Sequence, residues 1–101
     1  MMMEFKFNDA KLKENGYDDV MCFRTIDRYL NKKGIYAKEK GVYVADEEKA
    51  FLPFATLRGR LPMTDWFLKV IDQWYWFDDE NDTDYSDEGY NCLISYKKHG
   101  V

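Results

Sequence analysis

Large apolar residues recur at helical spacing between Thr64 and Phe77. Residues three or four positions apart lie on the same face of an α-helix, so this spacing favours a helix with one apolar stripe. Thr64 fits the N-cap position, Asp65 fits the first turn, and Pro62 lies just before the start. We therefore expect the main core helix of the protein at about 64–77. Its inner stripe would consist of Trp66, Phe67, Val70, Ile71, Trp74 and Phe77.

A second amphipathic helix is predicted over residues 18–33. Asp18 is a suitable N-cap, and Gly34 follows two lysines whose charge suits the C-terminal end of a helix dipole. The apolar stripe of this helix consists of Val20, Phe23, Ile26 and Leu30. Residues 35–45 are then rich in β-branched and aromatic side chains on both sides of a turn. They predict a β-hairpin in which Gly41 adopts the left-handed conformation.

Shorter elements are predicted in the N-terminal and middle parts of the chain. Phe5 and Phe7 alternate with charged residues, as in a short strand or an extended arm packed on the core. A short helix capped by Asn8 is expected over 9–15, where a glycine closes it. Another short helix is expected over 47–52, because Pro53 does not fit deep inside a helix.

The C-terminal part allows two interpretations, a helix over 87–98 or a strand over 92–96, because its apolar run is short. Taken together, the elements predict an α+β protein of three to four helices packed with one β-hairpin at about 35–45. The core would be centred on the helix at about 64–77. A chain of 101 residues has the usual size of one domain, so we expect 1–101 to form a single globular domain.

Charge is unevenly distributed along the chain. Residues 1–45 contain nine basic and seven acidic residues, whereas 46–101 contain six basic and twelve acidic residues. Seven of those acids lie within 78–88. Like charges repel one another and this segment has little to bury, so we expect a mobile acidic loop there.

An aromatic edge next to this loop supports the leading functional hypothesis. Tyr75 and Trp76 lie off the inner stripe of the expected core helix, and aromatic anchors with a charged rim are typical of protein-binding surfaces. We therefore expect a small non-catalytic accessory or regulatory protein that binds a protein partner or a second copy of itself. A basic nucleic-acid-handling protein would suit the acidic loop. The candidate binding residues are Tyr75, Trp76, Asp78, Asp79, Glu80, Asp82 and Asp84.

A basic row supports an alternative. Arg24, Arg28 and Lys32 stand at i, i+4 and i+8 and so form one row on the helix at 18–33. This helix is followed at once by an apolar strand and a glycine turn. The arrangement over residues 18–45 resembles the recognition helix and wing of winged-helix DNA-binding domains. The resemblance implies that this row and Asn31 face the major groove, and that the wing contacts phosphate. The wing residues would be Lys38 and Lys40.

Residues for catalysis or metal binding are sparse. His99 is the one histidine and lies near the end of the chain, away from any serine or cysteine partner motif. The acidic run does not match the calcium-loop template, and no phosphate-binding glycine motif is present, so we expect neither a metal nor a cofactor. Pairs of carboxylates remain at Asp65 with Asp72 and at residues 47 and 48. They make a carboxylate-dependent enzyme the third hypothesis, and we expect that the protein is not an enzyme.

The expected location follows from apolar runs and cysteine usage. The chain has no run of eighteen apolar residues and no apolar signal-peptide segment at its start, so we expect a cytoplasmic protein that does not bind membranes. Cys22 and Cys92 stand alone in their halves of the chain. We expect two buried free thiols rather than a disulfide.

Overall fold

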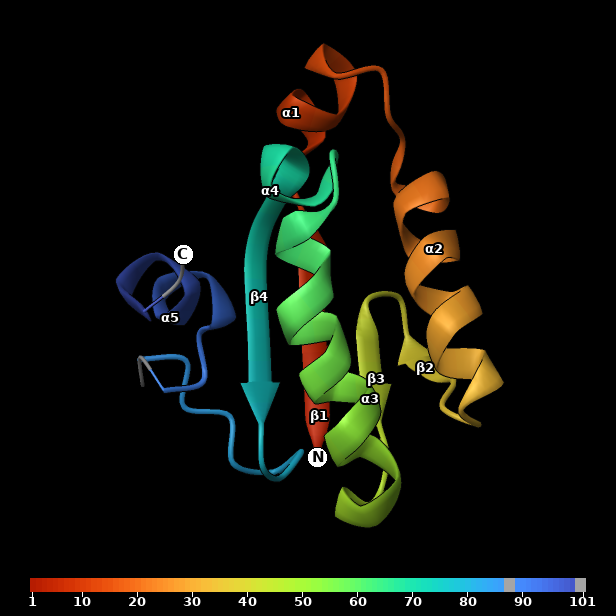
Figure 1. Ribbon diagram of the computed structural model, residues 1–101, viewed down its shortest axis with the longest axis vertical. Coiled ribbons are helices and arrows are strands. Elements are labelled where there is room, and N and C mark those ends of the chain that lie inside the picture. The colour runs from red at the N-terminus through yellow and green to blue at the C-terminus, as the bar shows by residue number, and fades with distance from the viewer. Residues whose placement is uncertain (87–88, 100–101) are drawn as a thin grey trace.

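The computed structural model describes residues 1–86 and 89–99 as a small compact α+β domain. Within these residues, a four-stranded antiparallel sheet packs with five α-helices and one short 3₁₀ helix (Figure 1). The predicted fold class is therefore confirmed, but the expected three to four helices and single hairpin fall short of this content.

The sheet is built around the N-terminal strand. Its order is β2 (Ala37–Glu39), β3 (Val42–Val44), β1 (Met2–Phe7) and β4 (Ile71–Phe77). Every neighbouring pair is antiparallel. Side chains alternate between the two faces of a strand, so Met3, Phe5 and Phe7 point to one face, and all three are buried. The predicted strand or extended arm at Phe5 and Phe7 is therefore the central strand of the sheet.

The predicted core helix at 64–77 is wrong. Only α4 (Phe67–Val70) is helical there, preceded by the 3₁₀ helix η1 (Leu61–Met63), and the chain then becomes β4. The expected N-cap is wrong as well, because Trp66 holds that position in α4. Thr64 Oγ1 accepts a hydrogen bond of 3.3 Å from Phe67 N, the first residue of α4.

The apolar pattern of β4 misled the helical prediction because both faces of the strand are covered. Trp74 and Phe77 point to opposite faces of the sheet, yet both are 0% exposed. A strand buried on both faces loses the alternation that distinguishes it from a helix. β1 also offers β4 a long hydrogen-bonded edge, with Phe5 opposite Trp74, and this non-local partner decides the conformation.

Helix α3 (Glu47–Arg60) corrects a second prediction, because it continues through Pro53 instead of breaking there. A proline inside a helix costs about 3 kcal/mol or more. The helix offsets this cost by burying an apolar stripe at helical spacing, and a buried large side chain contributes about 1.5–3 kcal/mol. The buried stripe consists of Ala50, Pro53, Phe54 and Leu57.

The other helices of the N-terminal half follow their predicted capping residues. α1 (Asp9–Glu14) begins where Lys11 N donates to Asn8 Oδ1 at 3.0 Å. α2 (Asp19–Lys32) begins where Met21 N donates to Asp18 Oδ1 at 2.8 Å. The hairpin of β2 and β3 turns at Gly41, whose φ of 82° is the predicted left-handed conformation.

The C-terminal segment is a helix, α5 (Cys92–His99), rather than a strand. The predicted helix over 87–98 began too early, because the N-terminal cap is Asn91. Its Oδ1 accepts hydrogen bonds of 3.1 Å from the backbone amides of Leu93 and Ile94. Residues 87 and 88 of that prediction lie outside the described residues. Backbone pairing holds α5 beside β4, since Trp76 N donates to Tyr90 O at 2.8 Å.

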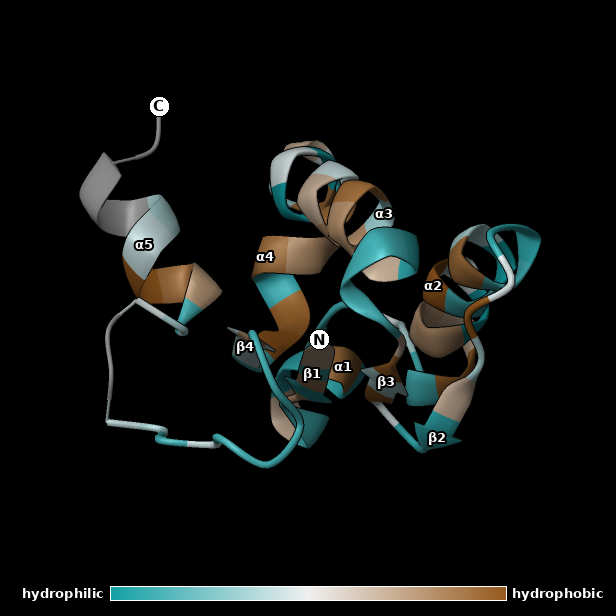
Figure 2. Ribbon diagram, turned by 90° about the horizontal axis from the view of Figure 1, so that it is seen from below, coloured by the Kyte–Doolittle hydropathy of each residue, from teal (hydrophilic) through white to brown (hydrophobic). Residues whose placement is uncertain are grey.

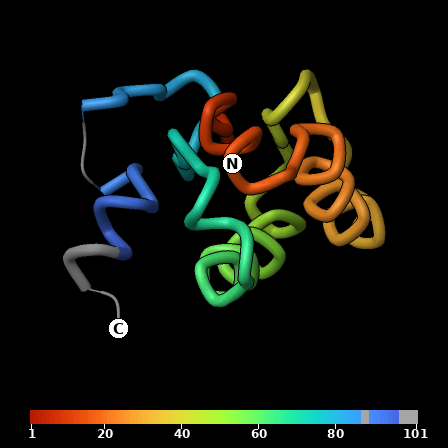
Figure 3. The backbone as a smooth tube through the Cα atoms, turned by 90° about the horizontal axis from the view of Figure 1, so that it is seen from above, coloured from red at the N-terminus to blue at the C-terminus, as the bar shows by residue number. Residues whose placement is uncertain are grey.

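The two faces of the sheet are covered differently. Helices α2, α3 and α4 lie on one face (Figure 2), where the main core forms around Phe5, Phe67 and Trp74. Residues 78–86, the acidic segment, contain no helix or strand and pass on the opposite side of the sheet from α3 (Figures 2 and 3). The predicted irregular acidic loop is therefore present over its described residues, and its mobility stays a prediction.

Both cysteines are free and buried, as predicted. Burial raises the pKa of the Cys22 thiol to about 11 and that of Cys92 to about 12. Both thiols are therefore protonated near neutral pH, and each acts as a small apolar side chain in the core.

Candidate functional site

A groove lies between α3 and α5, with the C-terminal half of β4 as its floor. Its volume is about 670 Å³, within the usual range for a binding pocket. We call it the α3–α5 groove. Its described lining consists of Phe51, Ala55, Arg58, Gly59, Trp76, Ser95 and Tyr96.

One face of α3 forms the long wall of the groove. Phe51, Ala55 and Arg58 follow one another at i, i+4 and i+7, so their side chains line up along the helix. Ala55 is small, and a side chain built at Gly59 would meet no atom within 4 Å. Small residues therefore leave space in the middle of this wall, between the aromatic ring of Phe51 and the cationic side chain of Arg58.

Trp76 forms the floor. Its ring lies 5.8 Å from the ring of Phe51, and it meets the ring of Phe54 edge-on at 6.2 Å, measured between centroids. The ring is half-buried, and among the described residues its Nε1 donates no hydrogen bond. Trp76 therefore contributes an apolar surface that is held in place by aromatic contacts with α3.

Phe51 is the most unusual residue of the groove, because 54% of its surface is exposed. The next residue, Leu52, is 71% exposed but does not line the groove. The Arg58 guanidinium donates to the Ser95 hydroxyl and so joins α3 to the opposite wall. Phe51, Trp76 and Tyr96 thus meet solvent in a groove with a polar rim.

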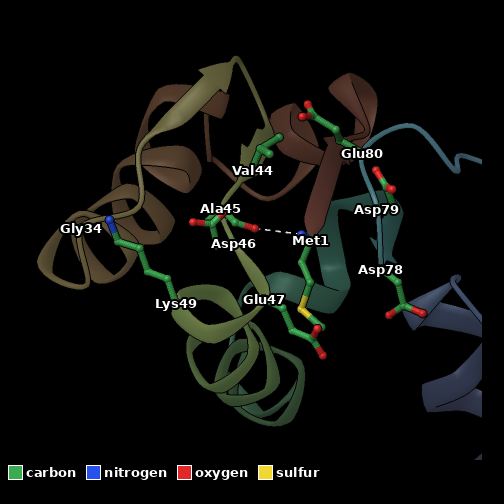
Figure 4. Close-up of a pocket in the computed structure, with 10 residues that line it drawn as sticks. All are labelled: Met1, Gly34, Val44, Ala45, Asp46, Glu47, Lys49, Asp78, Asp79 and Glu80. Atoms are coloured by element: carbon green, nitrogen blue, oxygen red, sulfur yellow. Dashed lines mark hydrogen bonds between the residues drawn. The ribbon is translucent and has the colours of Figure 1, made fainter.

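A second hollow, rich in carboxylates, lies where α3 begins and β4 ends (Figure 4). We call it the acidic hollow, and its volume is about 570 Å³. Its lining consists of Met1, Gly34, Val44, Ala45, Asp46, Glu47, Lys49, Asp78, Asp79 and Glu80. Within residues 1–86 and 89–99, no three histidine, cysteine or acidic side chains gather closely enough to hold a metal ion.

The structure separates the two aromatic residues of the predicted binding surface. Tyr75 and Trp76 are neighbours in β4 and therefore point to opposite faces of the sheet. Tyr75 stacks on Phe77 at 5.7 Å and lies under Tyr85 at 4.9 Å. Only Trp76 reaches the α3–α5 groove.

The acids of the predicted binding surface divide in the same way. Asp78, Asp79 and Glu80 line the acidic hollow. Asp82 accepts a hydrogen bond of 3.4 Å from the Tyr90 hydroxyl. Asp84 accepts from the hydroxyl and the amide of Ser86, and the hydroxyl bond, the larger cause, lowers the pKa of its carboxyl.

Two contacts tie the acidic segment to the rest of the protein. Glu80 forms a salt bridge of 2.9 Å with Lys38 of β2, which raises the pKa of that lysine. The Tyr85 hydroxyl donates to Glu4 of β1 at 2.7 Å, and this bond raises the pKa of Tyr85 to about 12. The segment therefore contacts two strands besides β4.

The basic residues of the nucleic-acid hypothesis lie on α2 and the hairpin. Arg24 and Arg28 line a hollow together with Asn31 and Lys40, and Lys32 is exposed on the same helix. However, Lys40 forms a salt bridge with Asp19, and Lys38 pairs with Glu80 as described above. A carboxylate of the protein thus competes with phosphate for each wing lysine, and DNA binding stays a prediction.

The carboxylate pair at Asp65 and Asp72 was proposed from helical spacing. Since no continuous helix spans both residues, that spacing does not apply: Asp65 precedes α4, and Asp72 lies on β4. The histidine considered for catalysis, His99, is the last residue of α5, and its side chain lies outside the described part of the structure.

Sequence reasoning missed Phe51, Arg58 and Tyr96 as groove residues. The expected break at Pro53 placed Phe51 and Arg58 in different elements. The signal that would have found them is the i, i+4, i+7 spacing of Phe51, Ala55 and Arg58, on a face of α3 distinct from its buried stripe.

No protein-family model, curated protein or solved structure matches the chain significantly. In the described part of the chain, no helix has the length and apolar character needed to cross a membrane. The geometry of the chain itself is therefore the basis for a functional proposal.

Proposed function

We propose that this protein is a non-catalytic binding protein whose protein partner inserts an apolar side chain into the α3–α5 groove. The observation that carries the proposal is the pair of Phe51 and Trp76, in which a largely exposed ring stands 5.8 Å from a half-buried one. Protein-binding surfaces are enriched in such aromatic anchors, and a few of them supply most of the binding free energy.

The surroundings of this pair support the same proposal. Trp76 is held by the buried Phe54 of α3, so the floor of the groove is already formed without a partner. A preformed surface loses little conformational entropy on binding. Arg58, Ser95 and Tyr96 add polar groups around the apolar centre, which is the usual arrangement of an apolar core with a polar rim.

Two neighbouring residues of α3 offer a matched test. Phe51→Ser removes the exposed ring from the groove, whereas Leu52→Ser removes a more exposed apolar side chain outside it. Neither side chain is buried, so both variants are expected to fold. Short random peptides displayed on phage would be selected on the wild-type protein, and the recovered peptides then measured by fluorescence anisotropy. We expect Phe51→Ser to weaken their binding by about tenfold or more, as for a hot-spot residue.

The control variant shows whether the loss of peptide affinity is specific to the groove. Leu52→Ser is expected to leave the affinity within about twofold, since it lies away from the contact. Circular dichroism spectra of both variants should match that of the wild type. The proposal would be overturned if selection recovered no specific peptides, or if the recovered peptides bound Phe51→Ser as tightly as the wild type.

A further inference from the structure

We infer that the partner of the α3–α5 groove is a cationic amphipathic peptide segment, with an apolar anchor side chain and a lysine or arginine about 6 Å further along. This inference rests on the proposed function, because it concerns the chemistry of what the same groove binds. It follows from the position of the acidic hollow, which lies next to Phe51 and Trp76 along both α3 and the end of β4.

A carboxylate lies within a few residues of each aromatic ring along its own segment of the chain. Glu47 precedes Phe51 by one helical turn on the same face of α3, a rise of about 6 Å. Asp78 follows Trp76 by two residues, directly after the end of β4, so at most about 7 Å of chain separates them. Phe51 and Trp76 are in contact, and Glu47 and Asp78 line one hollow. The aromatic pair of the groove is therefore followed by an acidic pair in the neighbouring acidic hollow, where Figure 4 shows Glu47 and Asp78.

The acidic pair lies in a negative environment. Asp46 and Asp79 line the same hollow. Among its described lining residues, the positive groups are the Lys49 side chain and the amino terminus of Met1, which donates to Ala45 O. Within the described residues, neither Glu47 nor Asp78 forms a salt bridge. A lysine or arginine of a partner would gain from several carboxylates at once, and such complementarity gives specificity and a faster association.

The opposite end of the groove has the opposite charge. Arg58 lies almost two helical turns beyond Phe51, away from Glu47. A basic side chain of the partner is therefore attracted at the end near Glu47 and repelled at the end near Arg58. This polarity fixes the direction in which a cationic segment lies along α3. It also disfavours an acidic segment as the occupant, because the larger charge of the site is negative.

Two double variants with the same change in net charge test the inference. Glu47→Gln with Asp78→Asn removes the acidic pair. Glu48→Gln with Asp72→Asn removes one exposed acid from α3 and one from β4, outside both hollows. The probes are the peptides recovered from the random library on the wild-type protein. Their sequences give one readout, and their affinities for both variants at low and high salt give another.

Peptides that depend on Phe51 are expected to carry a lysine or arginine near their apolar anchor, three or four residues away in a helix or two residues away in a strand. The Glu47/Asp78 variant is expected to bind them about fivefold more weakly at low salt, and high salt should reduce this difference. The Glu48/Asp72 variant should bind like the wild type.

The possible failures are distinguishable. The recovered peptides could depend on Phe51 but show no enrichment of basic residues, or they could bind both double variants equally. Either result would contradict the cationic partner but not the proposed binding groove. A library that yields no Phe51-dependent peptide would overturn the groove itself. If light scattering showed that the wild type is a dimer and that Phe51→Ser is a monomer, a second copy of the chain would occupy the groove. The inference would then be wrong.

Discussion

Trp74→Ala is expected to lower the free energy of unfolding by about 3–5 kcal/mol, the usual range for truncating a large buried aromatic side chain. Trp74 is 0% exposed at the centre of the core. Its ring stacks on Phe5 with centroids 6.0 Å apart and meets Phe67 edge-on at 4.8 Å. Alanine would leave a cavity between β1, β4 and α4, the three elements whose side chains meet there. Urea unfolding followed by circular dichroism measures the loss.

Two further variants show whether lost apolar packing causes the destabilisation by Trp74→Ala. The Trp74 Nε1 group is buried, and among the described residues it has no hydrogen-bond partner, so the indole stabilises the fold through apolar contacts. Trp74→Phe keeps an aromatic ring and is expected to cost less than about 2 kcal/mol. Trp66→Ala removes a half-buried ring and should cost less than Trp74→Ala. Equal losses for Trp66→Ala and Trp74→Ala would contradict the strand, because they fit a helix with both rings on one inner stripe.

Gly41→Ala is expected to destabilise the protein by about 2–3 kcal/mol or more, of which about 1–2 kcal/mol comes from the left-handed conformation. The φ of Gly41 is 82°. A Cβ atom there would lie 2.5 Å from the backbone oxygen of Phe5 and 3.1 Å from the ring of Phe23. Because the first of these atoms is backbone of the central strand, the hairpin would have to move away from β1.

Gly16→Ala is the matched control for this variant. Gly16 has a similar φ of 74°, but a Cβ atom there would meet nothing within 4 Å. Its substitution therefore measures the conformational cost alone, about 1–2 kcal/mol. Urea unfolding of both variants separates strain from steric overlap. Similar losses for the two glycines would contradict the close approach of the hairpin turn to β1.

Elements defined by local chemistry could be predicted from the sequence. Asn8 and Asp18 cap their helices as expected, and Gly41 adopts the turn conformation that the hairpin requires. Each of these features depends on residues within a few positions, so the local sequence contains the information. The α+β class followed from the same signals.

Elements decided by distant partners could not be predicted in this way. Ile71–Phe77 is a strand because β1 pairs with it from the other end of the chain, and coverage on both faces hides its alternation. Pro53 remains inside α3 because the buried residues around it outweigh its cost. Both errors arise from packing against elements far away in sequence.

The prediction of the candidate site was affected by the same two errors, at β4 and at Pro53. Trp76 was singled out from the sequence, but its expected companion Tyr75 points to the other face of β4. The ring that does contact Trp76 is Phe51 of α3, and this contact depends on the packing of α3 over β4, which the sequence did not predict. The acids at 78–80 directly follow β4 in sequence, and their role in binding stays a prediction.

The most direct test of the central claim is a titration of the ¹⁵N-labelled protein with a library-selected peptide, followed by the indole N–H signals in a heteronuclear correlation spectrum. The three tryptophans lie in different places: Trp76 in the groove, Trp74 in the core, and Trp66 beside Phe7 and Phe67. The account predicts that the indole signal of Trp76 and the amide signals around Phe51 move together, while the Trp66 indole stays in place. Shifts confined to α2 and the hairpin, with the Trp76 signal unchanged, would contradict it.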